Sequence, residues 1–319
     1  MTIRGKSPLR LSLAGGGTDF PEIFNESGGM VVSCTIDKFC HMSIEKRDDV
    51  ERFINGDILS RSKEPIIFSV LDEIKPEFGF NLTYYNDIDP GSGMGNSSSF
   101  TALLITLLLE LQNKIIDDRE LVELTYKIES KTTFGGWQDQ FATIMGGFNF
   151  MEFEKDRKTV YPIRIKYRTI CELEEHLIIC KLPRRKIKGS SIQKQKYKNL
   201  TEDYKNRLLK TKDIANEIKY ALLSNNILII GDLLHKTWEL KRDKLTTTNE
   251  IDKIYKLARN NKVLGGKVMG AGAGGHMLLF IRPEDRNNLV KELKKHNLEM
   301  VNFRFWPGGV ETWKVNKKI

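Results

Sequence analysis

The sequence lacks the features that mark secreted, zinc-binding and membrane-spanning proteins. Only four cysteines and five histidines occur in 319 residues, and no two cysteines have CxxC spacing. Free thiols in a reducing cytosol are therefore expected, rather than a disulfide framework or a zinc site. The longest apolar run, Ala102 to Leu109, is well short of the roughly 20 residues that a membrane span needs. The basic N-terminal segment also lacks the apolar core of a secretory signal. These absences predict a soluble, cytoplasmic protein.

Repeats and low-complexity tracts are absent as well, which excludes fibrous and disordered classes of protein. With 40% hydrophobic residues and a length of 319, the chain can form two compact domains or one large one. Its formal net charge is +9. This charge favours anionic partners such as nucleotides, sugar phosphates, nucleic acid or anionic lipid, but a solvated basic surface gives the same total.

Hydrophobic periodicity divides the chain into two parts. The expected strands are 30–36, 40–46, 148–154, 276–281 and 300–305, and the expected helices are 100–111, 117–131, 201–223, 227–242, 250–260 and 283–296. Asp117 and Glu120 have the spacing of a capping box at the start of the second helix. After a basic, polar stretch at 181–199 the chain turns to long helical patterns. We therefore predict an N-terminal domain at 1–165 and a C-terminal domain at 166–319.

The first of three glycine-rich loops is SPLRLSLAGGGTDF, at residues 7–20, where a strand-like run ends in three glycines. Thr18 and Asp19 place a hydroxyl and a carboxylate beside this flexible backbone. A ligand with several hydroxyls needs such groups, because each buried hydroxyl must find a hydrogen-bond partner. The local sequence equally fits a tight turn in which Asp19 caps a helix that begins at FPEIF.

The second loop, PGSGMGNSSSF at residues 90–100, opens the apolar run TALLITLLLEL. It is not a Walker P-loop, because the glycines do not fit GxxxxGK[ST] and no lysine follows them. A helix N-terminus nevertheless carries unpaired N–H groups and a partial positive charge, and glycines let this backbone approach a polyphosphate. Ser97 and Ser98 offer hydroxyls to phosphate oxygens or to a Mg²⁺ ion. A purely structural turn with a serine N-cap is the alternative.

The third loop, GAGAGG at residues 270–275, formally satisfies the dinucleotide pattern GxGxxG. A dinucleotide fingerprint follows a strand and opens a helix, whereas this loop runs into the strand-like HMLLFI. We therefore expect a glycine loop before a strand, lying close to a ligand or to the other domain.

Two acidic residues have surroundings suited to chemistry. Asp139 lies between two glutamines and two glycine pairs in GGWQDQFATIMGG, where it could orient or deprotonate a hydroxyl. Glu129, on the preceding helix, is a candidate metal ligand. Surface acids without a role are the alternative for both.

Four segments of the chain resemble motifs of the GHMP kinases and occur in the same order as in that family. They are PLRLSLAGGGTD, PGSGMGNSSS, GGWQDQ and KVMGAGAGG. The GHMP kinases are the superfamily of galactokinase, homoserine kinase, mevalonate kinase and phosphomevalonate kinase. The similarity spans nearly the whole chain. It is greatest to the sugar branch that includes D-glycero-D-manno-heptose 7-phosphate kinase, which phosphorylates the anomeric (C1) hydroxyl. The resemblance implies an α+β fold with an N-terminal domain like domain 2 of ribosomal protein S5, a ferredoxin-like C-terminal domain and a site between them.

The resemblance also implies roles for particular residues, with ATP and Mg²⁺ as cofactors. Asp139 would be the catalytic base, Arg10 the cation near the transferred phosphoryl group, and Ser97 with Glu129 the metal ligands. The implied ATP-binding loop is Gly91, Ser92, Gly93, Met94, Gly95, Asn96, Ser97 and Ser98. The residues that would face the sugar or close over it are Gly16, Gly17, Thr18, Asp19, Gly270 and Gly272. Asn96 and Met94 replace the serine and leucine usual in the family without removing a needed group.

A basic run near residue 185 is the candidate for binding a phosphate already present on the sugar, as a heptose 7-phosphate requires. The run consists of Arg184, Arg185, Lys186 and Lys188, followed by Ser190 and Ser191. Arg185 and Lys188 are the predicted substrate-binding residues among them. A solvated loop is the alternative for these charges.

The leading interpretation is an ATP-dependent sugar 1-kinase that converts D-glycero-D-manno-heptose 7-phosphate to the 1,7-bisphosphate, in the route to nucleotide-activated heptose for capsule or lipopolysaccharide. One alternative keeps the mechanism and changes the acceptor to fucose or galactose. Another is a non-catalytic RNA- or anion-binding protein. Because the basic residues are not interleaved with an aromatic stacking platform, no nucleic-acid partner is expected. Neither is a membrane partner, and the chain is expected to be a monomer or homodimer.

Overall fold

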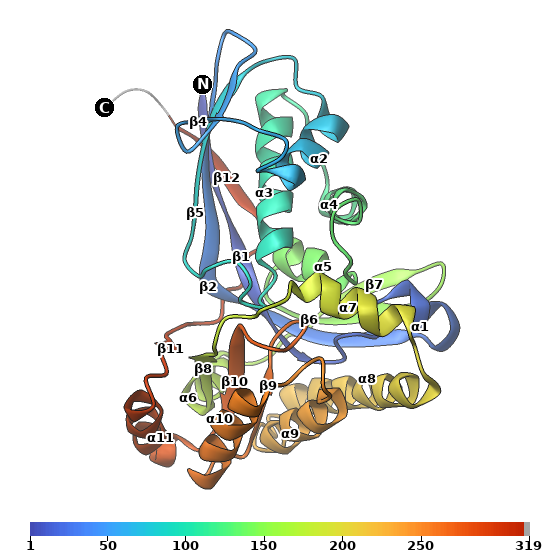
Figure 1. The fold of residues 1–319 in the computed structure, drawn as a ribbon, viewed down its shortest axis with the longest axis vertical. Helices are drawn as coiled ribbons and strands as arrows, with labels where there is room; N and C mark the ends of the chain where they lie inside the picture. The colour runs from blue at the N-terminus through green and yellow to red at the C-terminus, as the bar shows by residue number, and fades with distance from the viewer. Residues whose placement is uncertain (316–319) are drawn as a thin grey trace.

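The computed structural model describes residues 1–315, which form two β-sheets with helices packed on both (Figure 1). The strands are β1 (Thr2–Ala14), β2 (Gly29–Lys46), β3 (Arg52–Ile54), β4 (Asp57–Ile58), β5 (Phe80–Asn86), β6 (Phe148–Phe153), β7 (Lys158–Pro162), β8 (Leu177–Lys181), β9 (Gly265–Val268), β10 (His276–Phe280), β11 (Met300–Val301) and β12 (Glu311–Val315). The helices are α1 (Pro21–Ser27), α2 (Pro65–Ile74), α3 (Asn96–Leu111), α4 (Asp118–Glu129), α5 (Gln138–Met145), α6 (Tyr167–His176), α7 (Gly189–Lys198), α8 (Glu202–Leu223), α9 (Ile229–Lys241), α10 (Asn249–Asn260) and α11 (Pro283–Lys295).

The larger sheet is organised around the long strand β2. Its order is β12-β1-β2-β5-β3-β4, and β6 pairs with β2 and with β7. β1 and β2 are antiparallel, with Thr2 opposite Glu45. One part of β2, Cys40–Lys46, pairs with β5, while another part, Gly29–Cys34, pairs with β6. The predicted strands 30–36 and 40–46 are therefore two parts of one strand.

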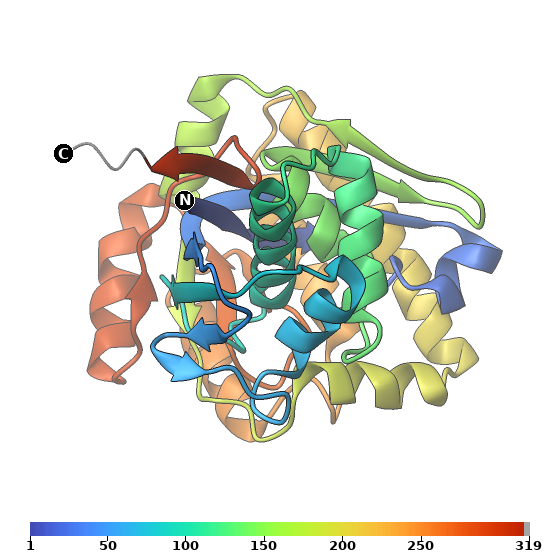
Figure 2. The same cartoon turned by 90° about the horizontal axis from the view of Figure 1, so that it is seen from above.

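Helix α3 packs against the face of β1 and β2 (Figure 1) and is seen nearly end-on in Figure 2. The apolar stripe of this predicted helix is formed by Leu103, Leu104, Leu107 and Leu108, which have no exposed surface. Thr101 is also covered, because α2, α4 and α5 pack around the same helix. This burial on most sides fixes the N-terminus of α3 beside the second glycine-rich loop.

The smaller sheet, β11-β8-β10-β9, is antiparallel and joins the larger one through a shared core. Helix α9 packs on β9 and β10, and helix α8 packs on α9 and on β1 and β2. Leu9 and Leu11 of β1 belong to the same buried cluster as Leu278 and Phe280 of β10. The two sheets are thus held together by continuous apolar packing.

The C-terminal part of the chain returns to the first sheet. β12 pairs antiparallel with β1, with Lys6 opposite Glu311. Residues 311–315, which belong to the predicted domain 166–319, are therefore part of the first sheet. The division near residue 165 stays a prediction, and its last four residues, 316–319, lie outside the described residues.

Most of the other predicted elements are present. The helices α3, α4, α8, α9, α10 and α11 and the strands β6 and β10 lie where periodicity placed them. The basic stretch 181–199 differs, because it contains α7, whose Ile192 is buried. The predicted strand 300–305 shrinks to β11, since the residues after it turn toward β2 and form only a bridge between Ile36 and Phe305.

The four cysteines are free, as predicted. Burial raises the pKa of the Cys40 and Cys180 thiols to about 12, which keeps both protonated at neutral pH. Within residues 1–315, no helix combines the length and the apolar character that crossing a membrane requires.

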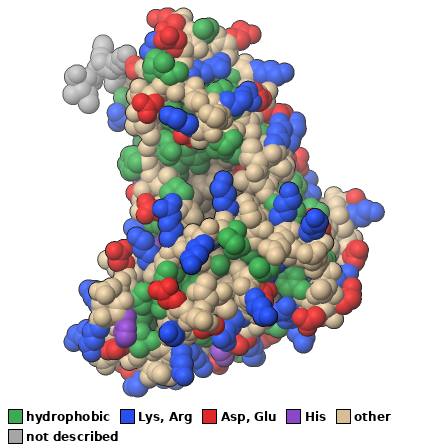
Figure 3. Space-filling view, in the orientation of Figure 1, with side chains coloured by type: hydrophobic (Ala, Val, Ile, Leu, Met, Phe, Trp, Pro, Cys, Tyr) green, Lys and Arg blue, Asp and Glu red, His purple; other side chains and the backbone are tan. Residues whose placement is uncertain are grey.

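Basic side chains are spread over the surface shown in Figure 3, on both the narrower upper part and the broader lower part of the molecule. Several of them pair with carboxylates in solvent, such as Arg47 with Asp49 and Arg61 with Asp72. Exposed pairs of this kind contribute little to folding stability. The surface charge by itself therefore does not indicate a binding site. The basic residues that bear on function are the buried ones.

The predicted cap of α4 can be tested directly. The carboxylate of Asp117 accepts a hydrogen bond from the backbone N–H of Glu120 at 2.8 Å. We expect Asp117→Ala to lower the free energy of unfolding by about 1 kcal/mol, because this N–H loses its partner. Chemical denaturation measures the change, and Asp117→Asn is the matched control, since asparagine keeps a capping oxygen. Equal losses in the two variants would contradict the capping role.

Candidate active site

A cavity of about 430 Å³ lies where β1, α5 and the three glycine-rich loops meet. The predicted site residues that line it are Arg10, Gly16, Gly17, Asp19, Gly91, Gly93, Gly95, Asn96, Ser97, Ser98, Glu129, Asp139, Arg185, Lys188 and Gly270. Four predicted residues do not line it, namely Thr18, Ser92, Met94 and Gly272. A larger hollow of about 1280 Å³ beside β6, β7 and α6 contains none of the predicted site residues.

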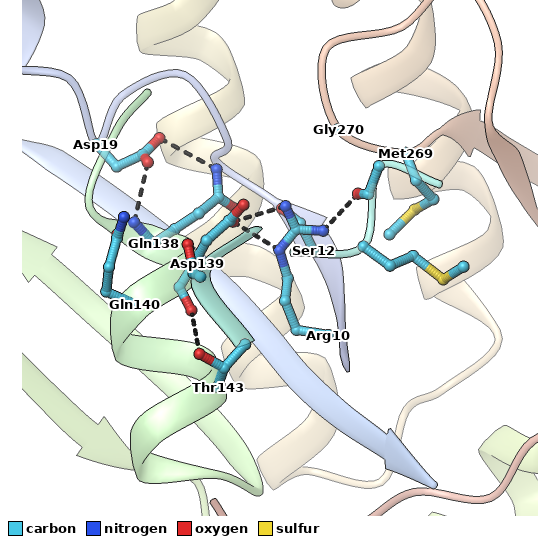
Figure 4. A network of polar contacts seen from close by, with 12 residues as sticks. Arg10, Ser12, Asp19, Gln138, Asp139, Gln140, Thr143, Met269 and Gly270 are labelled. Carbon is cyan, nitrogen blue, oxygen red and sulfur yellow. Dashed lines mark hydrogen bonds and ion pairs between the residues drawn. The ribbon is translucent and has the colours of Figure 1, made fainter. Parts of the chain in front are cut away.

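Arg10 lies at the centre of the cavity wall and is 3% exposed (Figure 4). Its Nε donates to Oδ1 of Asp139 at 2.8 Å, and its Nη2 lies 2.6 Å from the same oxygen. Its Nη1 donates to the carbonyl of Gly93 at 2.6 Å, and its backbone N–H donates to the carbonyl of Met94. One side chain on β1 therefore joins the second glycine loop to α5.

Asp139 is the second residue of α5, and its side chain is 29% exposed. A carboxylate in the first turn of a helix is stabilised by the helix dipole. Both contacts with Arg10 use Oδ1. The carboxylate thus combines a fixed orientation with access to the cavity, which is what a general base needs.

Asp19 is fully buried and braces the first glycine loop against the start of α5. Its carboxylate accepts from the backbone N–H of Gly17 at 2.8 Å and from that of Gln138 at 3.1 Å. Burial raises the pKa of Asp19, and these backbone hydrogen bonds act in the opposite direction. The turn interpretation, in which Asp19 caps the next helix, is wrong, because the N-cap of α1 is Phe20 and makes no side-chain bond.

This packing also explains one glycine of the GGWQDQ motif. A Cβ on Gly136 would lie 2.0 Å from a carboxylate oxygen of Asp19. Only glycine lets the chain pass so close to this side chain.

Thr18 holds the first loop in place and does not face the cavity. Its hydroxyl donates to the carbonyl of Gly15 at 2.8 Å and accepts from the backbone N–H of Met30 at 3.0 Å. Tyr197, from α7, donates its hydroxyl hydrogen to the carbonyl of Gly17 at 2.5 Å. The loop backbone is therefore fixed from both sides, and Gly16 and Gly17 remain at the cavity surface.

The second glycine loop leads into α3 with Gly91, Gly93 and Gly95 at φ values of 90°, 83° and 81°. These angles favour glycine over residues with a Cβ. Ser92 bonds through its hydroxyl to Asn96 and to the backbone N–H of Met94. Ser92 and the fully buried Met94 shape the loop from behind, while the glycines and the first residues of α3 line the cavity.

Glu129 is 4% exposed and accepts three hydrogen bonds at the base of α3. Its donors are Ser97, Ser98 at 2.7 Å and Gln140 at 2.6 Å. Burial raises the pKa of Glu129, whereas the three hydrogen bonds lower it. The oxygen of Gln140 has no hydrogen-bond partner within the protein although it is buried.

Hydroxyl and carboxylate oxygens are the ligands that Mg²⁺ prefers, so Ser97 and Glu129 fit this ion. Within the described part of the chain, no cluster of three or more His, Cys, Asp or Glu side chains could hold a metal ion. A Mg²⁺ ion here would therefore take most of its ligands from bound phosphate and water.

The third glycine loop packs directly on the second. A Cβ on Gly270 would lie 2.6 Å from the Cα of Gly93, so the two backbones are in contact. Gly272 lies farther back, against Thr246. The loop joins β9 to β10, so the prediction that it precedes a strand rather than a helix is confirmed.

The basic run divides into one half-buried residue and several exposed ones. Arg185 donates to the carbonyl of Gly274 from both Nε and Nη2, at 3.3 and 3.2 Å. Burial lowers its pKa, and the nearby positive charge of Arg10 adds to this effect. Lys188 lines the cavity but is exposed, whereas Arg184 and Lys186 are exposed and lie outside the lining.

Three lysines that are not among the predicted site residues also line the cavity, Lys196, Lys241 and Lys267. Lys196 lies 2.5 Å from a carboxylate oxygen of Asp243. Lys267 is 3% exposed, and burial lowers its pKa to about 7. The only signal in the sequence was a lysine inside the apolar segment that precedes the third glycine loop.

Two family models match parts of this chain, and a known kinase is similar to it over nearly its whole length. Residues 65–147 match the family model described as GHMP kinases N terminal domain, and residues 218–298 match GHMP kinases C terminal. A D-glycero-alpha-D-manno-heptose 7-phosphate kinase of Campylobacter jejuni is 32% identical over 98% of this chain and 99% of its own length.

Solved structures share the same architecture. A D-glycero-D-manno-heptose 1-phosphate kinase from Bacteroides thetaiotaomicron superposes with a TM-score of 0.81 at 26% identity, over 99% of this chain and 100% of its own. A mevalonate kinase from Methanococcus jannaschii superposes with a TM-score of 0.73 at 22% identity, over 96% and 98% of the two chains, which shows the fold alone. The predicted α+β fold is confirmed.

The buried ammonium of Lys267 makes stability depend on pH. Its pKa is about 7 in the folded protein, against about 10.4 in an unfolded chain. Between these values the unfolded chain binds a proton that the folded protein has released, so the free energy of unfolding from this group rises with pH from about 7 to about 10. The free energy of unfolding of Lys267→Met, compared with that of the parent protein, is therefore expected to be higher at pH 6 than at pH 9. The two differences should be separated by on the order of 2 kcal/mol.

Denaturant unfolding at the two pH values measures this difference, with the exposed Lys236→Met as the matched control. The same relative stability at pH 6 and pH 9 would show that Lys267 carries no depressed pKa.

Proposed function

The chain belongs to the GHMP kinases, and on that premise we propose that it phosphorylates the anomeric hydroxyl of D-glycero-D-manno-heptose 7-phosphate to give the 1,7-bisphosphate. The reaction class, ATP-dependent phosphorylation of a sugar, follows from the family and from the heptose-phosphate kinases that resemble the whole chain. The observation that carries the proposal is the Arg10–Asp139 pair, held at the mouth of the second glycine loop inside one cavity.

The second glycine loop and α3 supply the nucleotide site in this proposal. Backbone N–H groups at the start of α3 are unpaired within the helix, and the helix dipole favours negative charge there. Ser97 and Glu129 would hold Mg²⁺, which supplies positive charge to the phosphates of ATP when it is bound. Arg10, 3% exposed and bound to the carbonyl of Gly93, adds a second positive charge beside the loop.

The first glycine loop and the start of α5 supply the sugar site. Asp19, Gln138 and the backbone of Gly16 and Gly17 surround this part of the cavity. Several of their hydrogen bonds are made to each other, so the loop is fixed before a sugar arrives. A loop that is already fixed loses little further conformational entropy when the sugar binds.

The transfer itself needs one proton acceptor and one cation from the protein. Asp139 accepts the proton of the C1 hydroxyl, the C1 oxygen forms a bond to the γ-phosphorus, and the bond from that phosphorus to the bridging oxygen of ADP breaks. Arg10 stabilises the negative charge that spreads over the transferred group. Because Arg10 also binds Asp139 at 2.8 Å, base and phosphoryl site keep a fixed separation.

The proposal predicts a substrate pattern in a coupled ADP-release assay with Mg-ATP. Turnover is expected with D-glycero-D-manno-heptose 7-phosphate and not with the dephosphorylated heptose, galactose, fucose or mannose. Asp139→Asn should lower kcat by about 10²- to 10⁴-fold, because the proton acceptor is lost. Asp118→Asn, at an exposed position on α4, is the matched control and should retain full activity.

Turnover of an unphosphorylated sugar would support the kinase activity but would show that the acceptor is not the heptose 7-phosphate. No ADP release with any of these sugars, together with salt-sensitive RNA binding, would overturn the proposal in favour of a non-catalytic anion-binding protein.

A further inference from the structure

The cavity contains more buried positive charge than its own carboxylates neutralise. Two of its cations have acidic partners, since Arg10 pairs with Asp139 and Lys196 pairs with Asp243. Lys241 and Lys267 form no ion pair with any carboxylate in residues 1–315. Lys241 is partly buried and Lys267 is 3% exposed. Unpaired lysines in such positions are rare, because an ammonium loses hydration when it is covered.

Lys267 is held against the strand that leads to the sugar loop. Its ammonium donates to the carbonyls of Ser12 and Leu13, at 2.7 and 3.3 Å. An ammonium has three hydrogens, so one remains for a ligand. Ser12 and Leu13 belong to the end of β1 that leads into the first glycine loop, so the Lys267 ammonium lies beside the entry to the loop that we assign to the sugar.

Lys241, the last residue of α9, has the same arrangement. Its ammonium donates to the carbonyls of Val268 and Gly270, and a third hydrogen remains. Its pKa is lowered well below the ordinary lysine value, first by burial and then by the positive charges of Lys267, Lys196, Arg185 and Arg10. The two ammonium groups therefore disfavour each other's charged form, and a bound anion would stabilise both.

Ser12 provides an independent sign of a ligand. It is 5% exposed and lines the cavity, yet its hydroxyl oxygen has no hydrogen-bond partner within the protein. A Cβ on Gly16 would lie 3.2 Å from this oxygen, so the hydroxyl is next to the sugar loop. A buried hydroxyl without a partner costs free energy unless a ligand satisfies it.

We propose that Lys241, Lys267 and the Ser12 hydroxyl form the subsite for the phosphate group that the acceptor sugar already carries. The inference rests on the proposed function and adds the residues that select a phosphorylated acceptor. It places this selection on one buried and one partly buried lysine, from β9 and α9, and not on the basic loop at 184–188. Three donors from separate segments suit the three terminal oxygens of a phosphate monoester.

The test compares Michaelis constants for the two substrates. Lys241→Met and Lys267→Met should each raise the KM for D-glycero-D-manno-heptose 7-phosphate by about 10- to 100-fold, because a charge-assisted hydrogen bond is lost. The KM for ATP should stay within about twofold. Lys236→Met removes an exposed lysine from the same helix, α9, and should leave both constants unchanged.

Ser12→Ala covers the case in which a lysine variant does not fold. It removes a hydroxyl that has no partner in the protein, so folding should be retained, while the KM for the heptose 7-phosphate rises by about 3- to 10-fold. Calorimetric titration of the sugar phosphate without nucleotide gives the same comparison as a direct binding constant.

The outcomes separate this inference from the proposed function. If the parent protein neither binds nor phosphorylates the heptose 7-phosphate, the proposed function fails. If the parent protein is active but the variants raise the KM for ATP instead, the lysines belong to the nucleotide site and the subsite is overturned. Unchanged constants in all three variants would overturn it as well.

Discussion

The buried guanidinium of Arg10 is the interaction on which the rest of the site depends. A covered cation must have acceptors close by, and the guanidinium uses two, the carbonyl of Gly93 in the second glycine loop and the carboxylate of Asp139 on α5, which are far apart in the chain. When these segments pack on β1, they bring a carboxylate, a glycine loop and a helix N-terminus into one cavity. The hydrogen bonds that one buried side chain requires thus bring the groups of the site together.

Close backbone contacts set the distance between the two halves of the cavity. Gly93 and Gly270 touch without side chains between them, and Gly136 passes directly over the carboxylate of Asp19. A larger residue at Gly93 or Gly270 would push the second and third loops apart, and a larger residue at Gly136 would push the segment before α5 away from the first loop. The glycines therefore matter less for flexibility than for allowing three rigid segments to approach each other. The remaining space carries an excess of positive charge, which suits two phosphorylated ligands.

Local patterns were enough to predict most of the elements that position the site. The apolar stripe of α3, the Asp117 cap of α4 and the strand after the third glycine loop follow from spacing within a few residues. Asp139, Arg10, Ser97 and Glu129 were found through motif order, and the structure brings all four to one cavity. Their catalytic and metal-binding roles stay predictions.

Features that depend on distant partners could not be read from the sequence. In the sequence, β12 has the pattern of an ordinary short polar strand, and only the structure shows that it pairs with β1. Lys241 and Lys267 bind backbone carbonyls, which every residue possesses, so no partner residue marks them in the sequence. Asp19 fits a local helix cap equally well, and only the packing of α5 shows which N–H groups it binds.

The most direct test of the account is to determine which oxygen receives the phosphoryl group, by phosphorus–proton correlation NMR of the product made from heptose 7-phosphate and ATP. The account predicts a new phosphorus signal coupled to the anomeric proton, with the original phosphate still coupled to the protons at C7. Coupling of the new signal to any other sugar proton, or the appearance of inorganic phosphate alone, would contradict it.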